Sequence, residues 1–123
     1  MKRMFVMLML VSFTLSAQVI IDGVDINQMD DVEYCQIVGQ GKFLSAKIKI
    51  IVDYGQKRTL LGEKNFAIRG KDGKKIQFFS MIQALNFMYA NGWEYVDSHI
   101  VTVKSGLKGS QNVYHYILRR ART

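Results

Sequence analysis

One stretch of this 123-residue chain has the apolar spacing of an amphipathic α-helix, and it limits the folds that the chain can adopt. Apolar residues recur there at intervals of three and four, along one side of about three helical turns: Met81, Ile82, Leu85, Met88 and Tyr89. Parallel strands need long crossover connections, which are usually helices. Because the sequence indicates a single helix, it favours an antiparallel sheet.

Both ends of this helix carry capping signals. Ser80 and Gln83 have capping-box spacing, in which the Ser80 hydroxyl accepts from the N–H of Gln83 and the Gln83 side chain reaches back to the N–H of Ser80. Gly92, in the pair Asn91-Gly92, supplies the left-handed residue that often ends a helix. The chain then folds back onto the last turn, so we expect Trp93 to cover Met88 between helix and sheet rather than to stack on a ligand.

The other ordered segments are predicted to be strands. Residues 33–39, 94–104 and 112–120 are rich in β-branched and aromatic residues, with a polar, glycine-containing loop over residues 105–110. In residues 46–53 an apolar set alternates with a mostly polar one: Ala46, Ile48, Ile50 and Val52 against Lys47, Lys49, Ile51 and Asp53. Asp72-Gly73 predicts a hairpin turn within residues 65–79. The expected fold is α+β: a mostly antiparallel sheet with one helix packed on one face and a long C-terminal β-hairpin.

The N-terminus has the pattern of a secretory signal peptide. Lys2 and Arg3 precede an apolar run over residues 4–15, which is followed by the small residues Ser16 and Ala17. This pattern predicts cleavage between Ala17 and Gln18. The uncharged run extends to Ile21, so a retained membrane anchor is the alternative. The expected organisation is a signal peptide over residues 1–17, an acidic lead-in over residues 18–32 and a single α+β domain over residues 33–123.

The chain contains one cysteine, Cys35, so it has no internal disulfide. We expect Cys35 to be buried, as free cysteines usually are, although pairing with another chain is the alternative. Cys35 could act as a nucleophile with His99 or His115 as its base, but no local sequence signature supports such a pair.

His99 and His115 lie on the two arms of the predicted C-terminal hairpin. If they are directly opposite, their Cβ atoms are about 5 Å apart, and the two side chains could share a metal ion with Asp97. A shift of one residue would send them to opposite faces. The loop length leaves both registers open, and neither a metal nor another cofactor is predicted.

Charge is unevenly distributed along the chain. Residues 18–41 contain five acidic and no basic residues, whereas the chain from Lys42 onward contains 15 basic and five acidic residues. Export argues against nucleic acid as the ligand and leaves an anionic glycan, a lipid head group or an envelope protein as candidate partners. The candidate ligand-binding residues are Lys71, Lys74, Lys75, Tyr114, Tyr116, Arg119, Arg120 and Arg122.

Three short motifs in the second half carry a family resemblance. They are Leu85-Asn86, the turn Gly92-Trp93-Glu94 continuing into Tyr95-Val96, and the final strand Tyr116-Ile117-Leu118-Arg119-Arg120. On these motifs, the 43 residues from Ser80 to Arg122 resemble the small bacterial domain of unknown function family 4177. The resemblance implies an antiparallel sheet packed on one helix, and that family carries no established activity.

The sequence shows no catalytic constellation in this predicted α+β domain. We therefore expect a small, exported, non-enzymatic protein of the bacterial envelope that binds through a sheet face or edge. The alternative is an accessory subunit whose exposed strand edge pairs with a partner's sheet. A metal or enzyme site at His99 and His115 is a third, less favoured interpretation.

Overall fold

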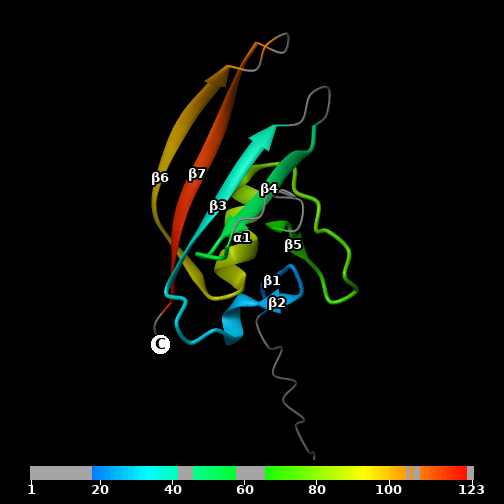
Figure 1. The fold of residues 1–123 in the computed structure, drawn as a ribbon, viewed down its shortest axis with the longest axis vertical. Coiled ribbons are helices and arrows are strands. Elements are labelled where there is room, and N and C mark those ends of the chain that lie inside the picture. The colour runs from blue at the N-terminus through cyan, green and yellow to red at the C-terminus, as the bar shows by residue number, and fades with distance from the viewer. Residues whose placement is uncertain (1–17, 42–45, 58–65, 105, 107–108, 122–123) are drawn as a thin grey trace, which may run out of the picture.

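Four antiparallel strands form the main sheet, in the order β4-β3-β7-β6 (Figure 1). The computed structural model describes residues 18–41, 46–57, 66–104, 106 and 109–121. The main strands are β3 (Tyr34–Gly41), β4 (Ile48–Asp53), β6 (Trp93–Lys104) and β7 (Ser110–Arg120). A smaller sheet has the order β2-β1-β5, formed by β1 (Ile20–Ile21), β2 (Val24–Asp25) and β5 (Ile68–Arg69).

The predicted α+β fold with one helix and a C-terminal hairpin is confirmed. The predicted signal peptide and Arg122 lie outside the described residues.

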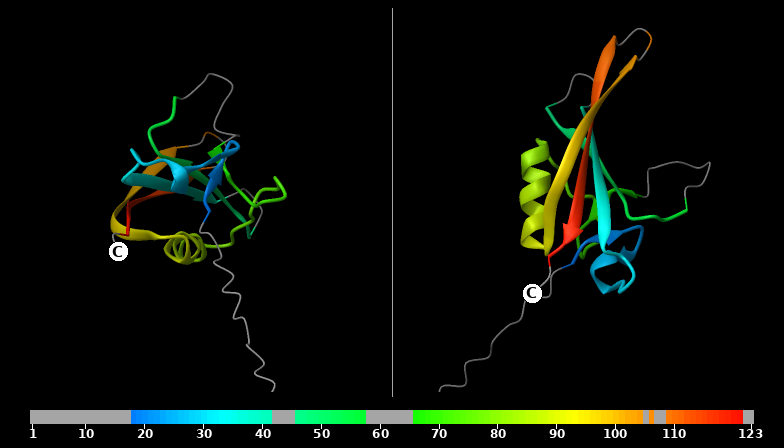
Figure 2. Two further views of the ribbon diagram at one scale, coloured as in Figure 1. Left: turned by 90° about the horizontal axis from the view of Figure 1, so that it is seen from below. Right: turned by 90° about the vertical axis from the view of Figure 1, so that its left-hand side faces the viewer.

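The helix α1 (Met81–Ala90) lies against one face of the main sheet (Figure 2). The Ser80 Oγ accepts from the N–H of Gln83 at 3.1 Å, as predicted. The Gln83 side chain instead accepts from the N–H of Phe79 at 2.8 Å, so the reciprocal half of the capping box is displaced by one residue. Gly92 has a φ of 89°, which confirms the left-handed end of the helix. Among the described residues, no helix is long and apolar enough to cross a membrane.

The buried side of α1 differs from the predicted stripe. Met81, Ala84 and Met88 are buried, whereas Ile82 is 61% and Tyr89 is 74% exposed. The small side chain of Ala84 allows close approach to the sheet, and a Cβ at Gly39 on β3 would clash with Sδ of Met81. The helix therefore faces the sheet with Met81, Ala84 and Met88, and not with the whole apolar stripe.

The main sheet has a helix-side face and an opposite face, and apolar residues are buried on both. Ile37, Ile50 and Val52 are buried on the helix-side face, as predicted for strand 46–53. Ile51 was expected on the polar face, yet it is only 6% exposed. It pairs with Val38 of β3, so the opposite face carries apolar packing of its own.

The segment predicted to be an acidic lead-in packs with the rest of the domain. Val19, Ile21 and Ile26 are fully buried in the core. Asp25 caps the 3-10 helix η1 (Ile26–Gln28), because its Oδ1 accepts from the N–H of Asn27 at 3.0 Å and from that of Val19 at 3.1 Å. Two-residue strands leave little periodicity to detect, so the sequence did not reveal this packing.

The predicted turn at Asp72-Gly73 is confirmed. The N–H of Gly70 donates to the carbonyl of Lys74 at 2.9 Å, and the N–H of Ile76 donates to that of Ile68 at 2.9 Å. Gly73 has a φ of 77°, in the left-handed region that such a turn requires. The other side of β5 pairs with β1 in the small sheet.

Candidate binding site

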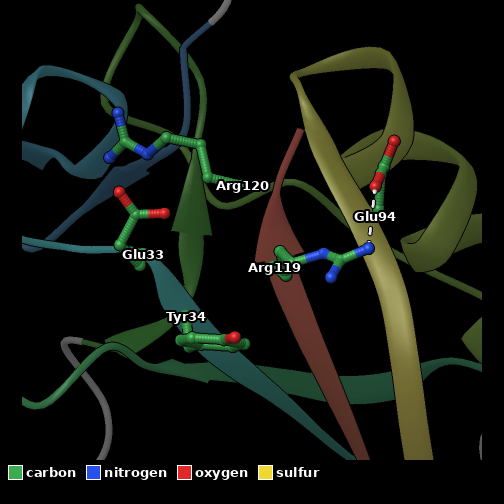
Figure 3. A pocket seen from close by; sticks show the side chains of 5 residues that line it. All are labelled: Glu33, Tyr34, Glu94, Arg119 and Arg120. Carbon is green, nitrogen blue, oxygen red and sulfur yellow. Dashed lines mark ion pairs between the residues drawn. The ribbon is translucent and has the colours of Figure 1, made fainter. Parts of the chain in front are cut away.

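A cavity of about 460 Å³ opens at the end of the main sheet where β3 and β6 begin and β7 ends (Figure 3). Its lining consists of Glu33, Tyr34, Glu94, Arg119 and Arg120. The antiparallel register explains this grouping, because Arg119 is paired with Tyr34 on one side and with Glu94 on the other. Three segments distant in sequence thus supply one site.

Arg119 and Tyr34 are among the accessible groups of this cavity, as is Glu33. The Nη2 of Arg119 lies 3.7 Å from Oε2 of Glu94, and the two side chains are 54% and 45% exposed. An exposed ion pair of this kind contributes about 0–1 kcal/mol, so Arg119 can exchange it for a contact with an anion at little cost. Tyr34 is 59% exposed and presents an aromatic ring at the same opening.

Arg120 lines the cavity but uses its donors inside the protein. Its guanidinium donates at 2.8–3.0 Å to four backbone carbonyls, those of Ile26, Asn27, Met29 and Val32. It also lies 5.3 Å from the ring centroid of Trp93. In Figure 3 the Arg120 and Arg119 side chains point away from each other. Arg120 therefore fixes the N-terminal segment, and Arg119 is the arginine that can bind a ligand.

The other residues predicted to bind a ligand lie elsewhere. Lys71, Lys74 and Lys75 are exposed around the turn that follows β5. Tyr114 and Tyr116 line a separate, mainly apolar cavity of about 320 Å³ near the start of α1. Of the described candidates, only Arg119 and Arg120 line the cavity beside Tyr34.

Glu33, Tyr34 and Glu94 were not predicted to be site residues. Tyr34 and Arg119 are more than 80 positions apart, and their pairing depends on β3 lying beside β7. Local sequence contains no signal for that neighbour relation. Only the order of the strands would have revealed it.

His99 and His115 are directly opposite, which is the register that would bring them together. Their rings are stacked, with centroids 4.6 Å apart and an interplanar angle of 6°. Stacked rings hold their nitrogen atoms in parallel planes rather than directing them at one ion. Within the described ranges, no group of three or more His, Cys, Asp or Glu side chains is placed to hold a metal.

Cys35 cannot act with either histidine. Its pairing with Leu118 places it on the helix-side face, whereas His115 pairs with Val38 on the opposite face. Cys35 is 4% exposed, as predicted, and this leaves its sulfur inaccessible for pairing with another chain. Burial raises the pKa of the Cys35 thiol to about 12, against the opposing charge of Arg120. The thiol therefore stays protonated and is a packing group.

Stability should fall at acidic pH because of His115. Burial lowers the pKa of His115 below its usual value, and the charge of His99 lowers it further. Its Nδ1 is buried without a hydrogen-bond partner among the described residues. Below about pH 6.5 this histidine binds a proton more readily in the unfolded chain than in the folded protein. The stability that His115 contributes is therefore complete above that pH and is lost below it. We expect His115→Phe to flatten the decline in urea midpoint between about pH 7 and about pH 5. Equal declines in both proteins would contradict this origin.

Comparison of the chain with models of protein families, with curated proteins and with solved structures gave no match. The resemblance to domain of unknown function family 4177 therefore stays a prediction.

Proposed function

We propose that this protein is an exported, non-enzymatic binding protein of the bacterial envelope that binds an acidic saccharide in the cavity at Tyr34 and Arg119. The observation that carries the proposal is that an exposed aromatic ring, Tyr34, and an exposed guanidinium, Arg119, line the same cavity of about 460 Å³. Cavities of about 300–1,000 Å³ suit small ligands or a short segment of a polymer.

The chemistry of the lining matches a sugar that carries a carboxylate. The apolar C–H face of a sugar ring packs on an aromatic ring such as Tyr34, and sugar hydroxyls donate to carboxylates such as that of Glu94. The planar guanidinium of Arg119 can bind a carboxylate through two parallel hydrogen bonds. A neutral sugar would leave that strong contact unused.

The overall charge supports an anionic ligand. The excess of ten positive charges from Lys42 onward creates a field that attracts anions and raises their rate of association. The five acidic residues of the preceding segment weaken this field locally, and one of them, Glu33, lines the cavity itself.

Export is supported by the pattern of residues 1–17. The N–H of Gln18 donates to Oδ1 of Asn91 at 3.1 Å, and Val19 is fully buried. Cleavage between Ala17 and Gln18 would therefore release a chain whose new terminus is anchored at the end of α1.

Intact mass measurement of the protein from its own host tests export. In the envelope or extracellular fraction we expect the mass of a chain that begins at Gln18. We also expect Ala17→Leu to slow processing, because signal cleavage needs small residues. A full-length mass beginning at Met1 in the wild-type protein would contradict cleavage.

Binding can be tested by calorimetry with a galacturonic acid trisaccharide and a neutral galactose trisaccharide. We expect the acidic sugar to bind more tightly and its affinity to fall with added salt. Arg119→Gln should weaken binding by about 10-fold or more, because a charge-assisted hydrogen bond contributes about 1.5–3 kcal/mol. Tyr34→Ala should weaken it by about 3-fold to 10-fold through loss of the aromatic contact.

Lys75→Gln is the matched control for charge, because it removes one positive charge from an exposed turn away from the cavity. Its affinity should equal that of the wild-type protein. Loss of binding in Lys75→Gln but not in Arg119→Gln would place the ligand at the lysine turn instead. Absence of binding to the acidic trisaccharide would reject an acidic saccharide of this type as the ligand.

A further inference from the structure

A further cavity, of about 260 Å³, opens between the small sheet and the C-terminal end of α1. Residues of β1, of the hairpin that begins with β5 and of α1 line it together, and Figure 1 shows β1 and β5 near the helix. This cavity shares no lining residue with the cavity at Tyr34 and Arg119. It is therefore a second, separate candidate site.

Much of the lining of this cavity is apolar. Three half-buried side chains contribute: Ile20 of β1, Ile76 of the hairpin and Phe87 of α1. The N–H of Ile76 donates to the carbonyl of Ile68 at 2.9 Å, which fixes that residue in the hairpin. Phe87 packs edge-to-face on Phe78, with ring centroids 5.7 Å apart. These fixed apolar groups favour the hydrocarbon part of a ligand.

Two cations also line the cavity, and none of its described lining residues is acidic. Lys71 is exposed, and Arg69 is half-buried. The Nη1 of Arg69 donates to the carbonyl of Gly73 at 2.8 Å, which positions the guanidinium while using one of its five N–H groups. Asp72, the acidic residue of the hairpin, accepts from the N–H of Lys74 at 3.0 Å. The opening therefore attracts an anion.

The side chain of Asn91, at the end of α1, is used within the protein. Its Oδ1 accepts from the N–H of Gln18 at 3.1 Å, and its Nδ2 donates to the carbonyl of Phe87 at 2.8 Å. The second bond satisfies one of the last carbonyls of the helix, whose partial negative charge would otherwise oppose an anion. Arg69 and Lys71 thus set the charge of the ligand.

We propose that this cavity binds a free aliphatic carboxylate of medium chain length. The chain packs on Ile20, Ile76 and Phe87. The carboxylate binds Arg69 and Lys71, because a guanidinium can hold both carboxylate oxygens through parallel hydrogen bonds. Drug-sized ligands occupy cavities of about 300–1,000 Å³, so this smaller one suits one short chain rather than the two long chains of a phospholipid. The site is independent of the saccharide site and of export.

Calorimetry with octanoate and with octanol tests the proposal. Octanoate should bind with an affinity that falls with added salt, and octanol should bind about 10-fold or more weakly because it carries no charge. Arg69→Gln should weaken octanoate binding by about 10-fold or more, and Lys71→Gln by about 2-fold to 5-fold, since Lys71 is exposed. Ile76→Thr should weaken binding of both compounds by about 3-fold or more through loss of apolar contact.

Lys74→Gln is the matched control for charge. Lys74 is exposed on the same hairpin as Lys71, but it does not line the cavity. Its substitution should leave the affinity for octanoate unchanged. Octanoate should also leave binding of the galacturonic acid trisaccharide unchanged, because the two cavities share no residue.

Four outcomes would overturn the proposal. The first is absence of octanoate binding, including a protein that binds phosphatidylglycerol vesicles but not octanoate. The second is equal binding of octanol, and the third is an equal loss of affinity in Lys71→Gln and Lys74→Gln. The fourth is competition between octanoate and the trisaccharide. The first three do not depend on whether the trisaccharide binds, so the two sites can fail separately.

Discussion

Replacing Arg120 with methionine is expected to lower the free energy of unfolding by about 3 kcal/mol. The side chain donates to four carbonyls of the segment from Ile26 to Val32. Methionine fills similar space and donates nothing, so those partly buried carbonyls lose their charged partner. The change should appear as a lower urea midpoint and as faster hydrogen exchange in η1, because this element loses its side-chain contacts with Arg120 of β7.

Arg119→Met is the matched control, since the same substitution is made one residue earlier on the same strand. Arg119 makes an exposed ion pair with Glu94, so its loss should cost less than about 1 kcal/mol of stability. It should instead abolish the preference for the acidic trisaccharide. Equal destabilisation by the two substitutions would show that the carbonyl contacts of Arg120 contribute little.

Replacing Trp93 with alanine should lower the free energy of unfolding by about 3–5 kcal/mol. The side chain is 1% exposed and belongs to the core, together with Met88 and Leu118. Its Nε1 also donates to Oδ1 of Asn27 at 2.7 Å, so the substitution removes a link to η1 as well as core volume. A small domain has about 5–15 kcal/mol of stability in total, so this variant should unfold well below the wild-type melting temperature.

Trp93→Phe separates the two contributions, because it keeps most of the apolar volume but removes the donor to Asn27. We expect it to cost about 1–3 kcal/mol, less than the alanine variant. Tyr95→Ala, which removes an aromatic ring that is 53% exposed on the same strand, should cost less than either. These changes can be followed by circular dichroism during heating. A Trp93→Ala variant as stable as Tyr95→Ala would contradict the role of Trp93 as a core residue.

Several parts of this structure were predictable from local sequence. Ser80 and Gly92 mark the two ends of α1 because capping depends on a few neighbouring backbone groups. The Asp72-Gly73 turn and the burial of Trp93 and Cys35 follow from similarly local rules. One helix among strands was sufficient to indicate an antiparallel sheet.

The buried side of α1, the packing of residues 18–32 and the different roles of Arg119 and Arg120 were not predictable in this way. Ile82 is apolar yet exposed, because the helix approaches β3 through Ala84 and Met81 opposite Gly39. Two consecutive arginines have identical chemistry, and only the alternation of a strand sends one to the cavity and the other to the N-terminal segment.

The sequence by itself therefore determined the type and ends of the main elements, the α+β class and the uneven charge. Those properties depend on side-chain chemistry and on interactions within a few residues. Tertiary structure decided the strand order, the pairing of His99 with His115 and the grouping of Tyr34, Glu94 and Arg119. The physical reason is that these contacts join segments from distant parts of the chain, and their geometry is fixed only when the whole sheet forms.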